Sequence, residues 1–234
     1  MTETLAFLKR NTAANSIDAT FDTTLWPNIA EENCFAMLCL ENGNRVYQRN
    51  PSPAAGVDNR IASGAKSQPF IAPKLQGRHT SQINPNTVSA EEFPWACTKE
   101  GGSTAYVFPA TLDEQFRVQG AQRNAIITGF RKYGVGFNDY FRITFEQPTP
   151  FGQYCSALHA NPPDMSICGN EPKQTLFGTA GVNIADFAYQ IVRSGVVPFA
   201  FMHVAGVNKG KVTKRDRDFD VSSILETAEE VKAE

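Results

Sequence analysis

The sequence has few of the residues that most enzyme chemistry requires. Among its 234 residues only three are histidines, His79, His159 and His203, and no run of about eighteen apolar residues occurs. Scarce histidine limits the number of catalytic bases and metal ligands. The missing apolar run predicts that no helix crosses a membrane. Residues 1–9 lack the apolar core of a signal peptide, because Glu3 interrupts them. We expect no membrane partner.

Cysteine is also sparse. The five cysteines are an odd number, lie far apart and have apolar neighbours, so reduced thiols in the cytoplasm are the simplest interpretation. Cys34 and Cys39 are five positions apart and would face opposite sides of a strand, which predicts core packing. Cys97, Cys155, His159 and Cys168 could together supply four zinc ligands. Their spacing is irregular and no CxxC or HxxxH element is present, so zinc stays an open alternative.

No complete catalytic motif is visible. Cys155 and His159 could form a nucleophile–base pair, but no third group supports it. Adjacent acids occur four times in polar contexts, where we expect solvated carboxylates with ordinary pKa values. These pairs are Glu31-Glu32, Glu91-Glu92, Asp113-Glu114 and Glu229-Glu230. Gly134-Val135-Gly136 lacks the further residues of a dinucleotide or phosphate loop. We therefore predict no cofactor and no enzymatic activity. An enzyme ranks third, after the two non-enzymatic functions given below.

Charge is distributed unevenly, although the formal net charge is only −2. Residues 1–116 carry 9 basic and 12 acidic side chains, net −3. Residues 117–215 carry 11 basic and 5 acidic ones, net +6. Residues 216–234 carry 2 basic and 7 acidic ones, net −5. The sequence thus joins a cationic second half to an acidic end, and segregated charge of this kind usually concerns a partner.

Aromatic residues alternate with the cations of this second half. Single-stranded nucleic acid is bound by this combination, because cations follow the phosphates while aromatic faces stack on bases. The predicted nucleic-acid-binding residues are Arg117, Arg123, Arg131, Lys132, Tyr133, Phe137, Tyr140 and Arg142, with auxiliary phosphate contacts from Lys209, Lys211, Lys214 and Arg215. An ordinary β-core with solvated arginines is the simpler alternative.

The hydrophobic pattern predicts an α+β protein. Its core would be a mainly antiparallel sheet or barrel-like sheet, with two late helices. Strands are expected at 34–40 and 45–47, joined by an Asn-Gly turn, and at 105–108, 115–119, 125–130, 140–145 and 196–207. Asn183 would cap a helix over 184–193, and Asp220 would cap one over 220–231. The second of these has an apolar stripe that should pack onto a partner surface.

Composition divides the chain into four parts. Residues 1–47 form an N-terminal segment with a β-hairpin, and 48–104 form an extended arm rich in Pro, Ser and Asn. A β-rich core with one helix follows at 105–208, and 209–234 hold a basic run and an acidic helix. The arm would be a flexible insertion or would order against a neighbouring subunit or ligand.

Two functions fit these features. The first is a sequence-tolerant nucleic-acid-binding protein with preference for single strands and an acidic C-terminal tail. The alternative is a non-enzymatic assembly subunit, such as a viral or filament component, in which the arm and the tail helix contact neighbouring subunits. Both interpretations favour a cytoplasmic homo-oligomer or larger assembly.

Overall fold

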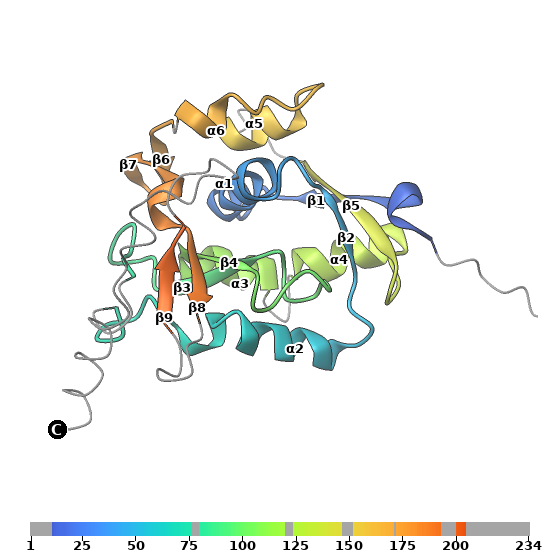
Figure 1. The fold of residues 1–234 in the computed structure, drawn as a ribbon, viewed down its shortest axis with the longest axis horizontal. Coiled ribbons are helices and arrows are strands. Elements are labelled where there is room, and N and C mark those ends of the chain that lie inside the picture. Colours follow the sequence, from blue (N-terminus) through green and yellow to red (C-terminus); the bar gives the residue numbers. More distant parts are fainter. Residues whose placement is uncertain are drawn as a thin grey trace, which may run out of the picture.

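One central helix organises the molecule. The computed structural model describes residues 11–75, 80–119, 124–146, 152–170, 172–192 and 200–204. Helix α1 (Pro27–Phe35) lies in the middle of the view, with α5 (Gln153–His159) and α6 (Ile167–Asn170) on one side. Strands β3 (Ser89–Phe93) and β4 (Tyr106–Ala110) lie on the other side (Figure 1). Because neighbours surround α1, its side chains from Ile29 onward are buried.

A three-stranded sheet lies beside α1, in the order β1-β5-β2. Strand β1 (Ile17–Asp22) pairs in parallel with β5 (Tyr140–Glu146), and β2 (Val46–Gln48) pairs antiparallel with the other edge of β5. In β5 the apolar residues Phe141, Ile143 and Phe145 are buried and alternate with more exposed residues. The alternation predicted for 140–145 is therefore confirmed.

A second sheet is antiparallel throughout, in the order β3-β4-β8-β9, and includes β8 (Tyr189–Val192) and β9 (Ala200–His203). Strand β4 confirms the strand expected at 105–108, although Pro109 does not end it, because this residue still aligns with Ala90 of β3. A separate hairpin joins β6 (Gln174–Leu176) to β7 (Thr179–Val182). None of these sheets closes into a barrel within the described residues, so the barrel-like core is not observed.

The apolar run at 34–40 is helical, so the strand predicted there is wrong. It forms the end of α1 and a π-helical turn, Ala36–Leu40. The expected Asn-Gly turn follows it, with Asn42 and Gly43 both at positive φ. Strand β2 after the turn pairs with β5 instead. Periodicity could not separate these alternatives, because all seven residues of this run are apolar and show neither a helical nor a strand period.

Two further predicted strands are helices. Residues 115–119 belong to α3 (Leu112–Gln119), and 125–130 belong to α4 (Ala125–Tyr133). The Asn124 side chain caps α4 by accepting a hydrogen bond from Ile127 N at 2.9 Å, and Gly134 ends it at φ 68°. Ile126, Gly129 and Phe130 are buried, which is helical spacing. The β-branched and aromatic composition favoured a strand, and tertiary packing reversed that preference.

The helix predicted at 184–193 is also wrong beyond its first turn. Asn183 does cap a turn, since its side chain accepts a hydrogen bond from Ala185 N, but the turn is a short 3-10 helix, Ile184–Phe187. The chain then continues as β8. Strand β9 lies within the strand expected at 196–207. The helix predicted at 220–231 lies outside the described residues.

Residues 48–104 contribute a helix and a strand to the folded molecule. Helix α2 (Pro53–Ala62) begins with Pro53 and is capped by Ser52, whose side chain accepts a hydrogen bond from Ala55 N. Strand β3 forms an edge of the second sheet. Phe70, Phe93 and Trp95 are almost completely buried. The sequence pattern indicated neither element, because prolines and polar residues interrupt any long period.

The fold class is therefore α+β, as the sequence predicts. Its core is strongly aromatic: Phe21 makes edge-to-face contacts with Trp95, Phe130 and Phe141 at 5.1 to 6.4 Å between ring centres. Gly129 of α4 lies directly against the Phe21 ring, where a Cβ atom would be only 2.5 Å from a ring carbon. Among the described residues, no helix combines the length and apolarity that crossing a membrane requires.

Candidate functional site

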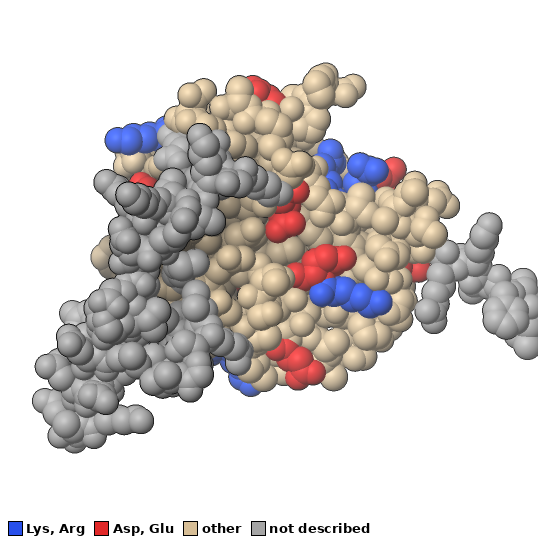
Figure 2. Space-filling model, in the orientation of Figure 1, with Lys and Arg blue, Asp and Glu red and all other residues tan. Residues whose placement is uncertain are grey.

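The predicted cationic residues that the structure describes lie on three different elements. Arg117 on α3 pairs with Asp113 at 3.1 Å, and Arg142 on β5 pairs with Asp18 at 3.5 Å. Arg131 and Lys132 are exposed in the last turn of α4. The face in Figure 2 shows charges of both signs in small separate groups, without a continuous basic surface. The remaining predicted cations, Arg123, Lys209, Lys211, Lys214 and Arg215, lie outside the described residues.

Arg117 and Lys132 meet at one hollow, which has a volume of about 460 Å³. Asp22 and Glu146 line the same hollow. The hydrogen bond from Lys132 to Tyr133 raises the pKa of the Lys132 ammonium, and the charges of these two acids act in the same direction. Two carboxylates therefore offset the two cations here, and this hollow is a poor site for a polyanion.

A stronger cationic feature lies at the end of α4. The guanidinium of Arg49 stacks over two rings, 4.7 Å from the centre of Phe130 and 4.4 Å from that of Phe137. Its Nη1 donates a hydrogen bond to the Val135 carbonyl oxygen at 2.5 Å, which fixes its position. Phe137 is 49% exposed, and the charge of Arg131 lies close enough to affect Arg49. We call Arg49, Arg131 and Phe137 the cation–aromatic surface.

Arg131 and Phe137 were predicted from the sequence, whereas Arg49 was not. Arg49 belongs to the loop after β2 and lies 82 positions before Arg131. Tyr133 and Tyr140 are half-buried. The ring of Tyr133 lies under Lys132, whose Nζ is 5.0 Å from its centre. The backbone of Tyr140 is bound by the side chain of Asn11 on both its N–H and its carbonyl. Both tyrosines are less exposed than Phe137.

A groove of about 360 Å³ adjoins this surface between α2 and α4. Its apolar residues come from both helices and from the segment after β3, and Arg60 of α2 is its cation. The groove is lined by Pro53, Gly56, Val57, Arg60, Trp95, Ala96, Cys97, Asn124, Ile126 and Ile127. Cys97 interacts electrostatically with Arg49, and Ile127 lies one helical turn before Arg131, so the groove and the cation–aromatic surface are continuous.

The acids expected on the surface are mostly buried, which corrects the sequence analysis. Glu31, Glu32, Glu91, Glu92 and Glu114 are all less than 9% exposed. Burial raises the pKa of each of these carboxyl groups. Asp113 is exposed as predicted, and Glu229-Glu230 lies outside the described residues. The apolar neighbours Ala90, Phe93 and Trp95 were the available signal for the burial of Glu91-Glu92.

Two of these acids cap helices. The Glu114 carboxylate accepts hydrogen bonds from Asn28 N at 3.0 Å and Ile29 N at 3.1 Å, in the first turn of α1. The Glu31 carboxylate accepts hydrogen bonds from Tyr154 N at 2.6 Å and Cys155 N at 3.0 Å, in the first turn of α5. Backbone N–H groups at a helix start lack partners within the helix, so both carboxylates satisfy buried donors.

Glu91 and Glu92 point to opposite faces of the second sheet, because they are consecutive in β3. Glu91 accepts hydrogen bonds from Gln115 Nε2 at 2.9 Å and Asn33 Nδ2 at 3.3 Å. Burial raises its pKa to about 7. Glu92 lies on the α2 face, where the Ser63 hydroxyl donates to it and the Arg60 guanidinium is 3.6 Å away. Glu92 therefore pairs with a residue that lines the groove.

Glu32 is the exception among the buried acids. It is fully buried, and neither carboxyl oxygen has a hydrogen-bond partner among the described residues. Burial raises its pKa well above the usual value, and the charges of Glu91 and Glu114 act in the same direction. The side-chain oxygens of Asn33 and Gln115 are also buried without donors. This cluster has more acceptors than donors, so a proton held on Glu32 would supply a donor.

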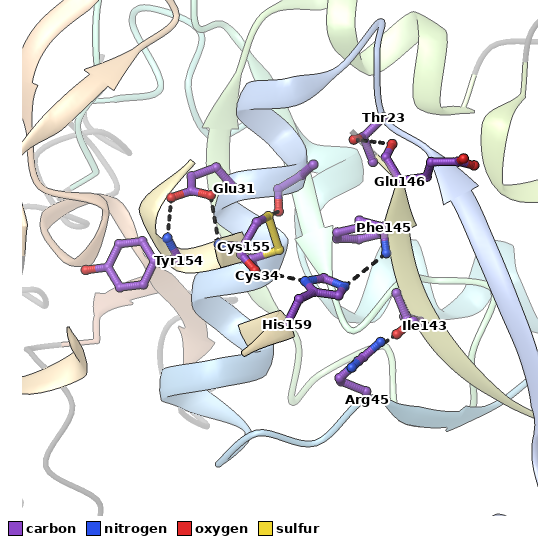
Figure 3. Close-up of a disulfide and its surroundings, with 11 residues drawn as sticks. Thr23, Glu31, Cys34, Arg45, Ile143, Phe145, Glu146, Tyr154, Cys155 and His159 are labelled. Carbon is purple, nitrogen blue, oxygen red and sulfur yellow. Dashed lines mark hydrogen bonds between the residues drawn. A yellow bond between two sulfur atoms is a disulfide. The ribbon is translucent and has the colours of Figure 1, made fainter. Parts of the chain in front are cut away.

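The cysteines contradict the reduced-thiol interpretation. Cys34 bonds to Cys155 and Cys39 bonds to Cys168, and only Cys97 is free. Figure 3 shows the first bond between α1 and α5, beside Glu31. The strand geometry that separated Cys34 from Cys39 does not apply, because both lie on one continuous helical segment.

The suggested zinc site is not formed. Cys155 and Cys168 are disulfide-bonded to different partners, and the described residues hold no group of three or more acidic, His or Cys side chains arranged for a metal ion. His159 links α5 to β5: its Nε2 accepts a hydrogen bond from Phe145 N at 3.2 Å, and its Nδ1 is 2.8 Å from the Cys155 carbonyl oxygen (Figure 3). Burial lowers the His159 pKa, which suits this neutral linking role.

His203 is the other histidine that the structure describes, and its contacts are structural. His203 is half-buried in β9 and its ring contacts Tyr189 edge-on at 5.6 Å. His79 lies outside the described residues. Comparison with protein-family models and with curated proteins finds no match for this chain. The geometry of the groove, the cation–aromatic surface and the buried carboxyl groups is therefore the basis for a function.

Proposed function

We propose that the protein binds single-stranded nucleic acid along the cation–aromatic surface and the α2–α4 groove. The observation that carries this proposal is the stack of Arg49 on the exposed ring of Phe137, with Arg131 beside it. An aromatic face next to fixed guanidinium groups can stack on a base while the cations contact phosphates. The adjoining groove offers apolar side chains to a second base, and Arg60 at its rim offers another cation.

Substitution of Phe137 and Arg131 tests this proposal. Phe137→Ala removes one stacking face, and we expect binding of a single-stranded oligonucleotide to weaken about tenfold at constant salt, measured by fluorescence anisotropy. Arg131→Gln should weaken binding and lower the slope of affinity against salt concentration by about one contact.

Lys173→Gln is the matched control for Arg131→Gln. Lys173 is an exposed cation beside β6, on the opposite side of α1 from α4 (Figure 1). We expect this variant to bind as tightly as the unmodified protein. Equal weakening by Lys173→Gln and Arg131→Gln would indicate attraction by overall charge and would contradict the proposed surface.

One observation supports the alternative function, that of an assembly subunit. Leu112 and Phe116 lie one turn apart on α3 and are 65% and 56% exposed. Neighbouring apolar side chains on one helix face are suited to a subunit contact. Size-exclusion chromatography with light scattering tests this role, and a monomer over a wide concentration range would contradict it.

A further inference from the structure

The α2–α4 groove has an unpartnered apolar side. Pro53, Val57 and Ile61 follow one another at intervals of four along α2, so they lie on one face of the helix. Val57 is 54% exposed and Ile61 is 48% exposed. Ile127 of α4 lines the same groove. A cleft between two helices with apolar side chains at these intervals has the form that accepts an amphipathic helix.

The groove and the adjoining surface carry charges of both signs. Arg60 lines the groove, and Arg49 and Arg131 belong to the adjoining surface. Asp58 is exposed on α2, Arg60 already pairs with the buried Glu92, and the charge of Asp139 acts on Arg49. Arg131 is exposed and takes part in none of the ion pairs between described residues. An occupant with an apolar stripe and negative charge near Arg131 would therefore suit this groove.

Residues 216–234 of this chain have both properties. They hold seven acidic and two basic side chains. Their apolar residues Val221, Ile224, Leu225, Ala228 and Val231 have the spacing of one helix face. Acids near the end of such a helix are unfavourable in isolation, because the helix dipole is negative there, and cations nearby would offset this cost.

The connection between this segment and the groove is long enough. The structure describes the chain as far as Val204, directly after β9. Gly64, just beyond the end of α2, lies against the ring of Phe201 in β9, so the described chain ends beside α2. Seventeen positions separate Val204 from Val221. This length spans up to about 55 Å when extended, whereas a ten-residue helix such as α2 is about 15 Å long.

We propose that residues 216–234 dock in the α2–α4 groove of their own chain through the apolar stripe, with their acidic side chains toward Arg60, Arg49 and Arg131. A docked segment covers Val57 and occupies part of the surface assigned to nucleic acid. It therefore competes with nucleic acid, and this consequence alone rests on the proposed function.

A thiol placed in the groove tests docking directly. In the full chain, Val57→Cys with Cys97→Ser leaves one free cysteine, at the exposed position 57. Adding Ile224→Asp and Leu225→Asp should expose this thiol and raise its rate of maleimide labelling about tenfold, because docking is lost. Ser222→Asp with Ser223→Asp adds the same charge away from the stripe and should leave the rate unchanged. Equal rates in all three proteins, with equal unfolding midpoints, would overturn the proposal.

Two further results complete the test. Labelling that slows as protein concentration rises would show that the segment of a second copy occupies the groove, and would overturn docking within one chain. The two pairs of substitutions are also compared in chains that keep Val57 and Cys97. The Ile224→Asp, Leu225→Asp protein should bind a single-stranded oligonucleotide more tightly than the Ser222→Asp, Ser223→Asp control. Absence of oligonucleotide binding in every variant would contradict the proposed function, whereas the labelling rates would still decide docking.

Discussion

At the scale of single residues, the buried glutamates are the main departure from ordinary protein chemistry. Glu31 and Glu114 satisfy helix termini, and Glu92 has an arginine and a hydroxyl. Glu91 is held by two side-chain amides. Glu32 has no hydrogen-bond partner in the described part of the chain, so burial makes its carboxylate form costly and raises its pKa.

This burial predicts that the protein loses stability as pH rises. The folded pKa of Glu91 is about 7, compared with 4.5 for an ordinary glutamate, and that of Glu32 is also raised. The unfolded chain therefore releases these protons first, and the free energy of unfolding falls between about pH 4.5 and pH 7 as far as Glu91 is concerned. Glu32→Gln should be more stable than the unmodified protein at pH 8, by roughly 1–3 kcal/mol, and nearly equal to it at pH 4.5.

Urea unfolding at the two pH values measures this effect. Comparing variants at each pH cancels contributions from other groups, including His159, whose lowered pKa costs stability on the acidic side. Asp58→Asn is the control, because Asp58 is exposed. A Glu32→Gln protein that is less stable at pH 8 would show that the carboxylate form is stabilised in a way the geometry does not indicate.

At the scale of elements, two disulfides join the same pair of segments. Cys34–Cys155 and Cys39–Cys168 both connect the α1 segment to the α5–α6 segment, with sequence separations of 121 and 129 residues. Once one bond is closed, the other closes only a loop of about 20 residues. In the chain-entropy model the first bond therefore contributes about 5 kcal/mol and the second about 3 kcal/mol.

The two bonds should consequently be non-additive. Replacing either pair of cysteines by alanine should cost about 3 kcal/mol, whereas replacing both pairs should cost about 8 kcal/mol, which exceeds the stability of many domains. Thermal or urea unfolding of the three variants measures this, and Cys97→Ser is the control because that thiol is free. A double replacement that costs no more than the sum of the single ones would contradict this account.

Element prediction from the sequence succeeded where one face of a strand is exposed. Strand β5 was predicted correctly, because its alternation of buried and exposed residues has only one explanation. The run at 34–40 and the segment 125–130 were assigned to strands, although they lie in helices. In the first case burial on all sides removes the periodic signal. In the second, tertiary packing of α4, whose Gly129 lies against Phe21, outweighs the strand preference of its β-branched residues.

At the scale of the whole molecule, the disulfides change the expected environment. Bonds of this kind persist in oxidising compartments and are rare in the cytoplasm. The cytoplasmic location thus stays an untested prediction whose premise, five reduced thiols, is wrong. Thiol titration of the denatured protein should detect one thiol per chain without reductant and five after reduction. Five thiols in protein purified from its natural source without reductant would contradict the disulfides.

Candidate sites were predictable only in part. Composition identified Arg131 and Phe137, because cations and aromatic residues alternate locally in that region. Arg49 and Arg60 lie far from Arg131 in the sequence, and only folding brings them close to α4. Arg142 and Arg117 were predicted on charge alone, and each has an acidic partner in the folded protein.

By itself, the sequence determined the α+β class, the alternating strand β5 and the separation of positive from negative charge, because each depends on residues close together in the chain. Only the tertiary structure decided which cysteines pair, which glutamates lose water and which arginines share a surface. These properties arise from contacts between residues often more than fifty positions apart. Such contacts depend on how α1 is enclosed by the other elements, and no local pattern records that arrangement.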